Sequence, residues 1–160
     1  MLTGSLAKNM FRMKPQLYIY FALVSLTCGA TTNAATSSDD QSRLVAQANA
    51  LVAKTDYLQA EAIYSRLIRD DPDCGIYWAN RGVIRTLEKQ YKTAETDFLT
   101  ALQISTDDAF AMTGLGRLYI RIGKLDYAEW YLIHALQINP EDTVAIQELS
   151  LLHEIQNKKG

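Results

Sequence analysis

The residues best suited to metal binding or proton transfer in this chain are its two histidines, His134 and His153. Neither has a second histidine four residues later, or a cysteine at the spacing of a zinc ligand set. We interpret His134 as a solvated side chain on the polar side of a predicted helix. The pattern therefore predicts no metal site.

Two other motifs could suggest an enzyme. The glycine-rich stretch TGLGR at residues 113–117 follows no predicted strand, whereas a phosphate-binding loop connects a strand to a helix. The acidic pairs at 70–71 and 107–108 lie between predicted helices, where carboxylates cap the helix that follows. Without a convergent set of catalytic groups, we expect a non-enzymatic protein that needs no cofactor.

The composition favours long regular elements. Of the 160 residues, 48% are apolar, which is enough to bury a core in one folded unit. Three prolines and eight glycines are few for this length, and a strand-and-turn architecture would need more such breakers. The predicted fold class is therefore all-α.

The N-terminal segment, 1–34, has the order of a secretory signal peptide. Lys8, Arg12 and Lys14 precede an apolar run at 17–30, and the small residues of TTNAAT follow. The run is short for a bilayer span, which needs about 20 apolar residues. We predict cleavage after Ala34 and export to the periplasm or the medium.

Several alternatives stay open for this segment. Translation from Met13 would also leave an adequate basic flank, and an uncleaved segment would anchor the chain in a membrane, the one membrane contact that we expect. Lipidation would use Cys28, although Thr27 does not match the residue usual at such sites. In the mature chain we interpret Cys74 as a small, partly buried side chain in a turn, with a reactive or intermolecular thiol as the alternative.

The charge balance argues against a nucleic-acid partner. The formal net charge is -2, and without the three basic residues of the signal segment 13 basic and 18 acidic residues remain, a net charge of -5. The remaining lysines and arginines are scattered singly or in pairs rather than clustered as phosphate binding requires.

A tetrapeptide repeats in this chain: ALQI occurs at 101–104 and again at 135–138, and we call the shift between the two copies the period. The period continues without insertion, and it aligns Ala60 with Ala94 and Ala128, Tyr64 with Phe98 and Leu132, and Ala48 with Gly82 and Gly116. Each unit holds two apolar-periodic stretches of helix length, such as 110–122 and 125–138. We expect the small residues to let two antiparallel helices approach while the aromatic side chains fill the angle between them.

This pattern resembles the tetratricopeptide repeat, whose 34-residue unit reads W-x2-L-G-x2-Y, then A-x3-F, then P. Arg81 and Arg85 depart from it, in place of a leucine and a tyrosine. The resemblance implies a right-handed α-solenoid of helix-turn-helix repeats with a covering helix at its end. The predicted organisation is a signal peptide (1–34), a linker (35–40), three repeats (41–74, 75–108 and 109–142) and a capping helix with a tail (143–160).

In this family the first helix of each unit lines a concave groove that binds extended peptides or partner helices. Carried over by position, the resemblance places these side chains in the groove: Val45, Asn49, Val52, Ile76, Ala79, Asn80, Val83, Leu87, Phe110, Thr113, Arg117, Ile120, Arg121, Val144, Gln147 and Leu151. The best-known groove of the family clamps a carboxylate with two asparagines and three basic residues. Asn49 and Asn80 match the asparagines, but Val45, Phe110 and Gly114 stand at the basic positions, so we do not expect an adaptor for chaperone tails.

The functional prediction is a non-enzymatic scaffold that binds a protein or peptide segment. Exported arrays of this size are similar in architecture to periplasmic assembly factors of pili, secretion systems and envelope complexes. The alternatives are a self-associating structural scaffold, which would be a homo-oligomer, and an accessory subunit of an enzyme complex.

The signal segment gives the first testable prediction. Expressed in a secreting host, the mature chain should begin at or near Ala35, because a peptidase would cut after the small residues that follow the apolar run. Mass spectrometry of the N-terminus measures this directly. An intact Met1 or Met13 on a cytoplasmic product would contradict export.

Overall fold

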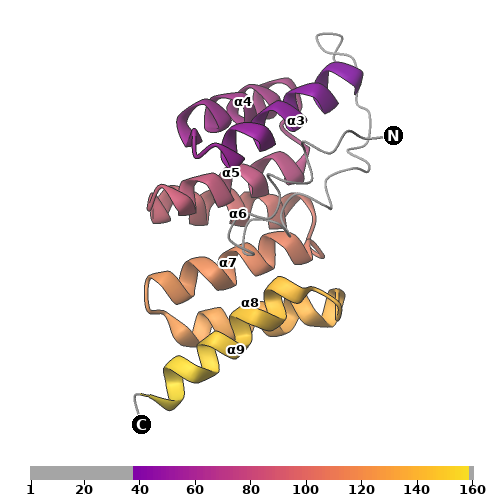
Figure 1. Ribbon diagram of the computed structural model, residues 1–160. Helices are drawn as coiled ribbons and strands as arrows, with labels where there is room; N and C mark the ends of the chain where they lie inside the picture. The colour runs from indigo at the N-terminus through magenta and orange to yellow at the C-terminus, as the bar shows by residue number, and fades with distance from the viewer. Residues whose placement is uncertain (1–37, 159–160) are drawn as a thin grey trace, which may run out of the picture.

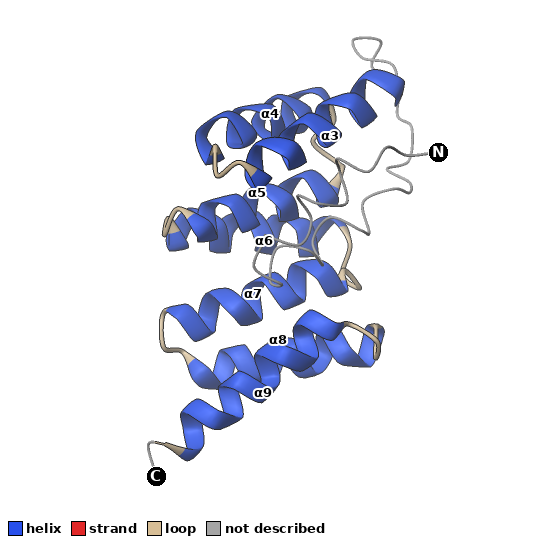
Figure 2. Ribbon diagram, in the orientation of Figure 1, coloured by secondary structure: helices blue, strands red, loops and turns tan. Residues whose placement is uncertain are grey.

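The computed structural model describes residues 38–158, and in this part of the chain every regular element is a helix (Figures 1 and 2). The helices are α3 (Ser38–Ala53), α4 (Tyr57–Asp70), α5 (Gly75–Leu87), α6 (Tyr91–Ile104), α7 (Ala109–Arg121), α8 (Leu125–Ile138) and α9 (Thr143–Asn157). They stack as successive pairs, so the predicted all-α solenoid of helical repeats is confirmed. Residues of the predicted signal peptide lie outside the described residues.

The helices follow the period of the sequence. Helices α5 and α7 begin at Gly75 and Ala109, one period apart. Each turn within a pair passes through one left-handed residue, again at this spacing: Thr55 and Lys89, both with φ 63°, and Gly123 with φ 77°. Helix α3 begins at Ser38, so the last three residues of the predicted linker are helical.

Aspartates cap three helices. The carboxylate of Asp56 accepts a hydrogen bond from Gln59 N, and that of Asp108 accepts one from Ala111 N. Asp142 accepts from Val144 N and Ala145 N, which places the cap one residue before the threonine that begins α9. These bonds satisfy amide groups that have no partner within the helix.

The expectation that the acidic pair at 70–71 caps the next helix is wrong. Asp70 ends α4, and its neighbour Asp71 is the C-cap of that helix, with its N–H bonded to Leu67 O. Cys74 holds the N-cap position of α5 and is buried at 1% exposure, without a side-chain capping bond. Three residues of turn separate the acidic pair from α5, which is too far for capping.

Within each pair the two helices meet at small residues. Ala60, Ala94 and Ala128 are fully buried. A Cβ atom added to Gly82 would lie 3.0 Å from Phe98 Cε1, and one added to Gly116 would lie 2.5 Å from Leu132 Cγ. The predicted close approach is therefore present, and the large side chain of the second helix fills the space that the glycine leaves.

Helix α9 covers the last pair. It packs against α8 and α7, with Ala145 and Leu152 fully buried and Val144 at 8% exposure. Thr113 Oγ1 on α7 donates a hydrogen bond of 2.8 Å to Asp142 Oδ2, the carboxylate that also caps α9. The capping helix is thus held by apolar burial and by a polar tie at its first turn.

Enlarging either close-contact alanine should destabilise the fold. Ala94→Leu and Ala128→Leu are each expected to lower the free energy of unfolding by about 1 to 3 kcal/mol, because a close-packed site must shift to admit three more carbon atoms. Urea unfolding followed by circular dichroism measures the change. The matched control is Ala62→Leu on the exposed side of α4, where we expect little effect. Equal stability of all three variants would contradict this packing.

Candidate partner-binding groove

The first helices of the pairs form one side of the molecule. Helix α5 contacts α7 and α7 contacts α9, so the three lie side by side (Figure 1). Between them are two hollows that share one residue, Arg117. We call the hollow between α5 and α7 the first hollow and the one between α7 and α9 the second hollow.

The two hollows differ in size and lining. The first is shallow and is lined by Val83, Thr86, Leu87, Phe98, Gly114, Arg117 and Arg121. The second has a volume of about 200 Å³ and is lined by Arg117, Val144, Gln147, Glu148 and Leu151. Apolar side chains thus alternate with charged ones along this face.

The structure therefore brings together part of the predicted groove. The predicted residues on the first hollow are Val83, Leu87, Arg117 and Arg121, and those on the second are Arg117, Val144, Gln147 and Leu151. Sequence reasoning placed neither Phe98 nor Glu148 in the groove. Phe98 comes from the second helix of its pair and reaches the first hollow beside Gly114, which has no side chain to block it.

Other predicted groove residues lie in the core. Val45 and Val52 are each 9% exposed and belong to the apolar cluster around Tyr64. Ala79 is fully buried and Thr113 is 2% exposed. Ile76, Phe110 and Ile120 are half-buried against the same clusters. These side chains therefore belong to the core beneath the groove more than to the groove surface.

The two predicted asparagines are both bonded within the chain. Asn49 Oδ1 accepts a hydrogen bond of 2.8 Å from Tyr64 Oη, and Asn80 Nδ2 donates one of 2.7 Å to Ile76 O. Burial raises the pKa of Tyr64, whose hydroxyl stays protonated as this donor. Each asparagine thus uses one half of its amide locally, and Nδ2 of Asn49 and Oδ1 of Asn80 have no hydrogen bond among residues 38–158.

The shared residue Arg117 is held in place by an ion pair. Arg117 Nε lies 2.8 Å from Glu148 Oε1, and the two side chains are 11% and 13% exposed. This pair joins α7 to the capping helix across the second hollow. Arg121, one turn further along α7, is exposed, and the described part of the chain offers it no ion pair.

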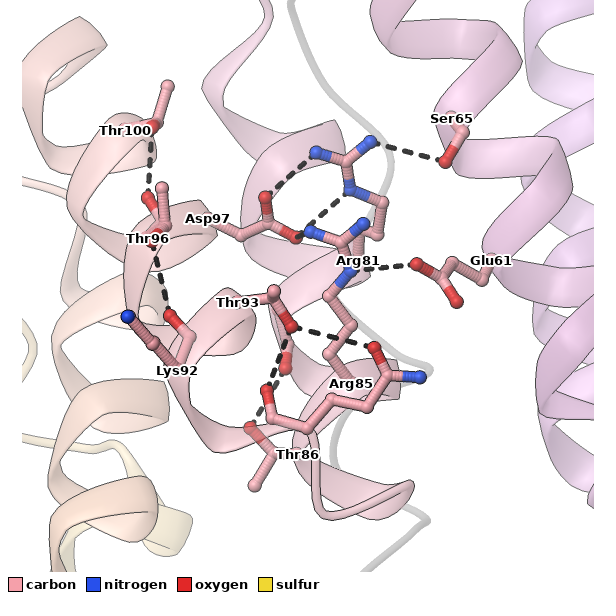
Figure 3. A network of polar contacts seen from close by, with 12 residues as sticks. Glu61, Ser65, Arg81, Arg85, Thr86, Lys92, Thr93, Thr96, Asp97 and Thr100 are labelled. Atoms are coloured by element: carbon pink, nitrogen blue, oxygen red, sulfur yellow. Dashed lines mark hydrogen bonds and ion pairs between the residues drawn. The ribbon is translucent and has the colours of Figure 1, made fainter.

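A second set of charges connects the first two pairs of helices (Figure 3). Asp97, 1% exposed, accepts hydrogen bonds of 2.8 and 2.9 Å from Arg81 and one of 2.9 Å from Arg85. Arg81 also donates to Ser65 Oγ at 3.1 Å, and Arg85 Nε donates to Glu61 Oε1 at 2.7 Å. The two arginines that depart from the repeat pattern therefore share one buried carboxylate.

The contact between Arg85 and Glu61 recurs along the stack. One period later Tyr119 Oη donates to Glu95 Oε1 at 2.6 Å, and one period later again His153 Nε2 lies 3.6 Å from Glu129 Oε1. Burial, followed by the neighbouring Glu95, raises the pKa of Tyr119, which keeps its proton for this bond. The second helix of each pair thus contacts the first helix of the following pair through a glutamate. In the sequence this glutamate directly follows the aligned alanine of each repeat.

Other kinds of site are absent from the described residues. Within 38–158, no three histidine, cysteine or acidic side chains gather where they could hold a metal ion. Nor does any helix in this range have the length and apolar character to cross a membrane.

Comparison with known proteins identifies the repeat. Residues 45–109 match the tetratricopeptide repeat family. Anaphase-promoting complex subunit 3 of Schizosaccharomyces pombe is 26% identical over 107 residues, which is 67% of this chain. The match covers 16% of that protein, so the chain spans about one sixth of the relative's length.

Solved structures share the fold. The first repeat domain of Spaghetti (RPAP3), bound to an HSP90 peptide, superposes with a TM-score of 0.68 at 20% identity, covering 76% of this chain and 97% of that one. The type III secretion chaperone SycD of Yersinia enterocolitica, in complex with a peptide of the translocator YopD, gives 0.67 at 20% identity, covering 78% and 98%. At these identities the likeness establishes the architecture.

The buried charge network gives a stability prediction. Asp97→Ala should lower the free energy of unfolding by about 3 to 5 kcal/mol, because it leaves two arginines without their shared carboxylate. Removing an exposed carboxylate, in Asp126→Ala, should change it by less than about 0.5 kcal/mol. Chemical unfolding of the two variants provides the comparison.

A triple variant tests whether the loss comes from uncompensated charge. Arg81→Leu, Arg85→Tyr and Asp97→Tyr together install the residues that the third pair has at the same positions, Leu115, Tyr119 and Tyr131. We expect stability near that of the wild type, since apolar replacement of a buried ion pair is often neutral. A triple variant as unstable as Asp97→Ala would contradict this explanation.

Proposed function

Because the chain is a tetratricopeptide repeat protein, we propose that it is a non-enzymatic scaffold that holds a segment of another protein along the face of α5, α7 and α9. The segment would be extended or helical and would lie across the two hollows. The observation that carries the proposal is the pair of adjoining hollows that share Arg117.

The lining suits a protein segment. Leu87 and Val83 offer apolar contacts in the first hollow, and Leu151, 43% exposed, offers one in the second. Polar groups at Arg121 and Gln147 would fix the register of the segment. A surface that combines apolar side chains with polar and charged groups is typical of sites that recognise protein segments.

The mode of recognition would differ from a carboxylate clamp. Val45 lies in the core, Phe110 is half-buried, and Gly114 faces the ring of Phe98, so the three positions that would need basic residues provide none. The similar structure with an HSP90 peptide therefore supports the architecture of binding, and we do not extend its ligand to this chain.

We place this scaffold outside the cytoplasm, in the assembly of an envelope, pilus or secretion complex. The support is the N-terminal sequence, with its basic flank, apolar run and small-residue exit. A type III secretion chaperone that binds a translocator peptide has the same fold, which fits a role in assembly.

The first experiment locates the partner on the surface. A photo-reactive phenylalanine derivative at Leu151, in the second hollow, should cross-link to a protein segment in the cells that produce the chain. The matched control is the same substitution at Leu58, 75% exposed on α4. Cross-linking from Leu58 but not from Leu151 would show that the partner binds outside the groove.

The second experiment is a calorimetric titration of the cross-linked segment. Arg121→Gln removes an exposed charge from the first hollow and Gln147→Ala removes an exposed amide from the second, so a lost partner bond should weaken affinity by about 5- to 150-fold, or roughly 1 to 3 kcal/mol. Asn49→Asp and Asn80→Ala test whether the segment also reaches the asparagines of α3 and α5. Lys92→Gln, exposed on α6, is the control for lost charge. Equal affinity of all folded variants would refute groove binding.

A further inference from the structure

The two hollows of the groove differ in what they can hold. The second hollow, with a volume of about 200 Å³, is larger than the roughly 150 Å³ cavity that holds a benzene ring in a protein interior. It therefore admits a leucine or phenylalanine side chain. The first hollow has a volume of about 10 Å³, which is near the minimum for one water molecule. A partner side chain can enter the second hollow but can only lie over the first.

The first hollow is shallow because an aromatic ring fills its floor. Phe98 reaches it from α6, is 1% exposed, and lies against Gly114, where a Cβ atom would collide with the ring. Val83 and Leu87 form the apolar wall on α5. The hollow therefore offers a thin apolar surface, bordered by the exposed side chain of Arg121.

The charges that line the groove do not cancel. Among the described residues, the charged side chains on the two hollows are Arg117, Arg121 and Glu148. Arg117 and Glu148 match one another in their ion pair of 2.8 Å, whereas Arg121 pairs with no carboxylate of residues 38–158. Glu88, at the end of α5, accepts a hydrogen bond from Gln90 instead, at 3.0 Å. One positive charge is therefore left over, at the first hollow.

We propose that the partner segment is both apolar and acidic: a leucine or phenylalanine of the segment enters the second hollow, and an aspartate or glutamate pairs with Arg121 at the first. The assignment rests on the proposed function, because it specifies the segment that the groove holds. Hydrogen bonds between a guanidinium and a carboxylate are about twice as strong as neutral ones. A basic residue at the same place in the segment would bring like charge to Arg121 and would be rejected.

Helix packing sets the distance between these two residues of the segment. The hollows lie on either side of α7, and neighbouring packed helices are about 8 to 10 Å apart. An extended chain advances about 3.3 Å per residue and spans this distance in about three residues. A helix rises about 1.5 Å per residue and needs about seven residues, or two turns, to present both side chains on one face.

A phage-displayed library of random peptides, selected on the purified full chain, provides the probe. Peptides that bind the groove should be lost with Leu151→Asp, in the second hollow, and kept with Leu58→Asp, which is 75% exposed on α4. We expect these peptides to be enriched in aspartate and glutamate at the predicted distance from a leucine or phenylalanine. Selection on Arg121→Gln should keep the apolar residue and lose the acidic one, whereas selection on Lys92→Gln, an exposed charge on α6, should keep both.

An exchange of charges gives the quantitative test. Fluorescence anisotropy of the best-binding peptide should show that replacing its acidic residue with lysine weakens binding to the wild type at least five-fold. Arg121→Glu should weaken binding of the unaltered peptide by a similar factor and restore binding of the lysine peptide. Circular dichroism confirms that the variant is folded, and if Arg121→Glu loses helicity, Arg121→Gln replaces it with the same expected loss for the unaltered peptide.

The outcomes separate this proposal from the proposed function. Peptides that depend on Leu151 but show no acidic preference, or that bind Arg121→Glu as well as the wild type, would overturn the acidic segment and leave the groove in place. If no selected peptide depends on Leu151, binding in the groove fails, and the acidic segment fails with it.

Discussion

The close approach of two helices at small residues is the constraint on which this structure depends. A large side chain of each second helix must lie over a glycine or alanine of the first, and Phe98 lies within 3.0 Å of the position that a Cβ on Gly82 would take. Once a pair is fixed at this separation, its glutamate falls within reach of the next first helix. The stack then propagates through the same contact, at Glu61, Glu95 and Glu129.

The helix pairs share this geometry, but one contact between their two helices is aromatic in the third pair and ionic in the second. Where the third pair stacks Tyr119 on Tyr131 with ring centroids 5.6 Å apart, the second pair joins Arg85 to Asp97 at 2.9 Å. Each of these residues lies one period from its counterpart, so the same two positions face one another in both pairs. In the sequence, Arg81 and Arg85 appeared only as two departures from the repeat pattern. The carboxylate that binds both arginines, that of Asp97, lies on another helix.

The groove was less predictable than the fold, and for a physical reason. The period of the sequence assigns a residue to a side of its helix, but how much of that side chain stays accessible depends on how tightly neighbouring helices pack. Thr113 was expected at the surface and is instead buried through its bond to Asp142, at the start of the capping helix. Arg117 lines both hollows, and its partner Glu148 belongs to the capping helix, with no sequence signal that pairs the two.

Helix α9 is held from two sides, and this gives it two different faces. On one side Arg117 pairs with Glu148 and the second hollow opens beside Leu151; on another, His153 meets Glu129 and Ile146 is exposed. A helix that only covered the stack would need a polar outer surface. The exposed side chains of Gln147, Ser150, His153 and Glu154 provide most of such a surface, while Leu149 packs against the core of the last pair and Ile146 and Leu151 are the exposed apolar residues of α9.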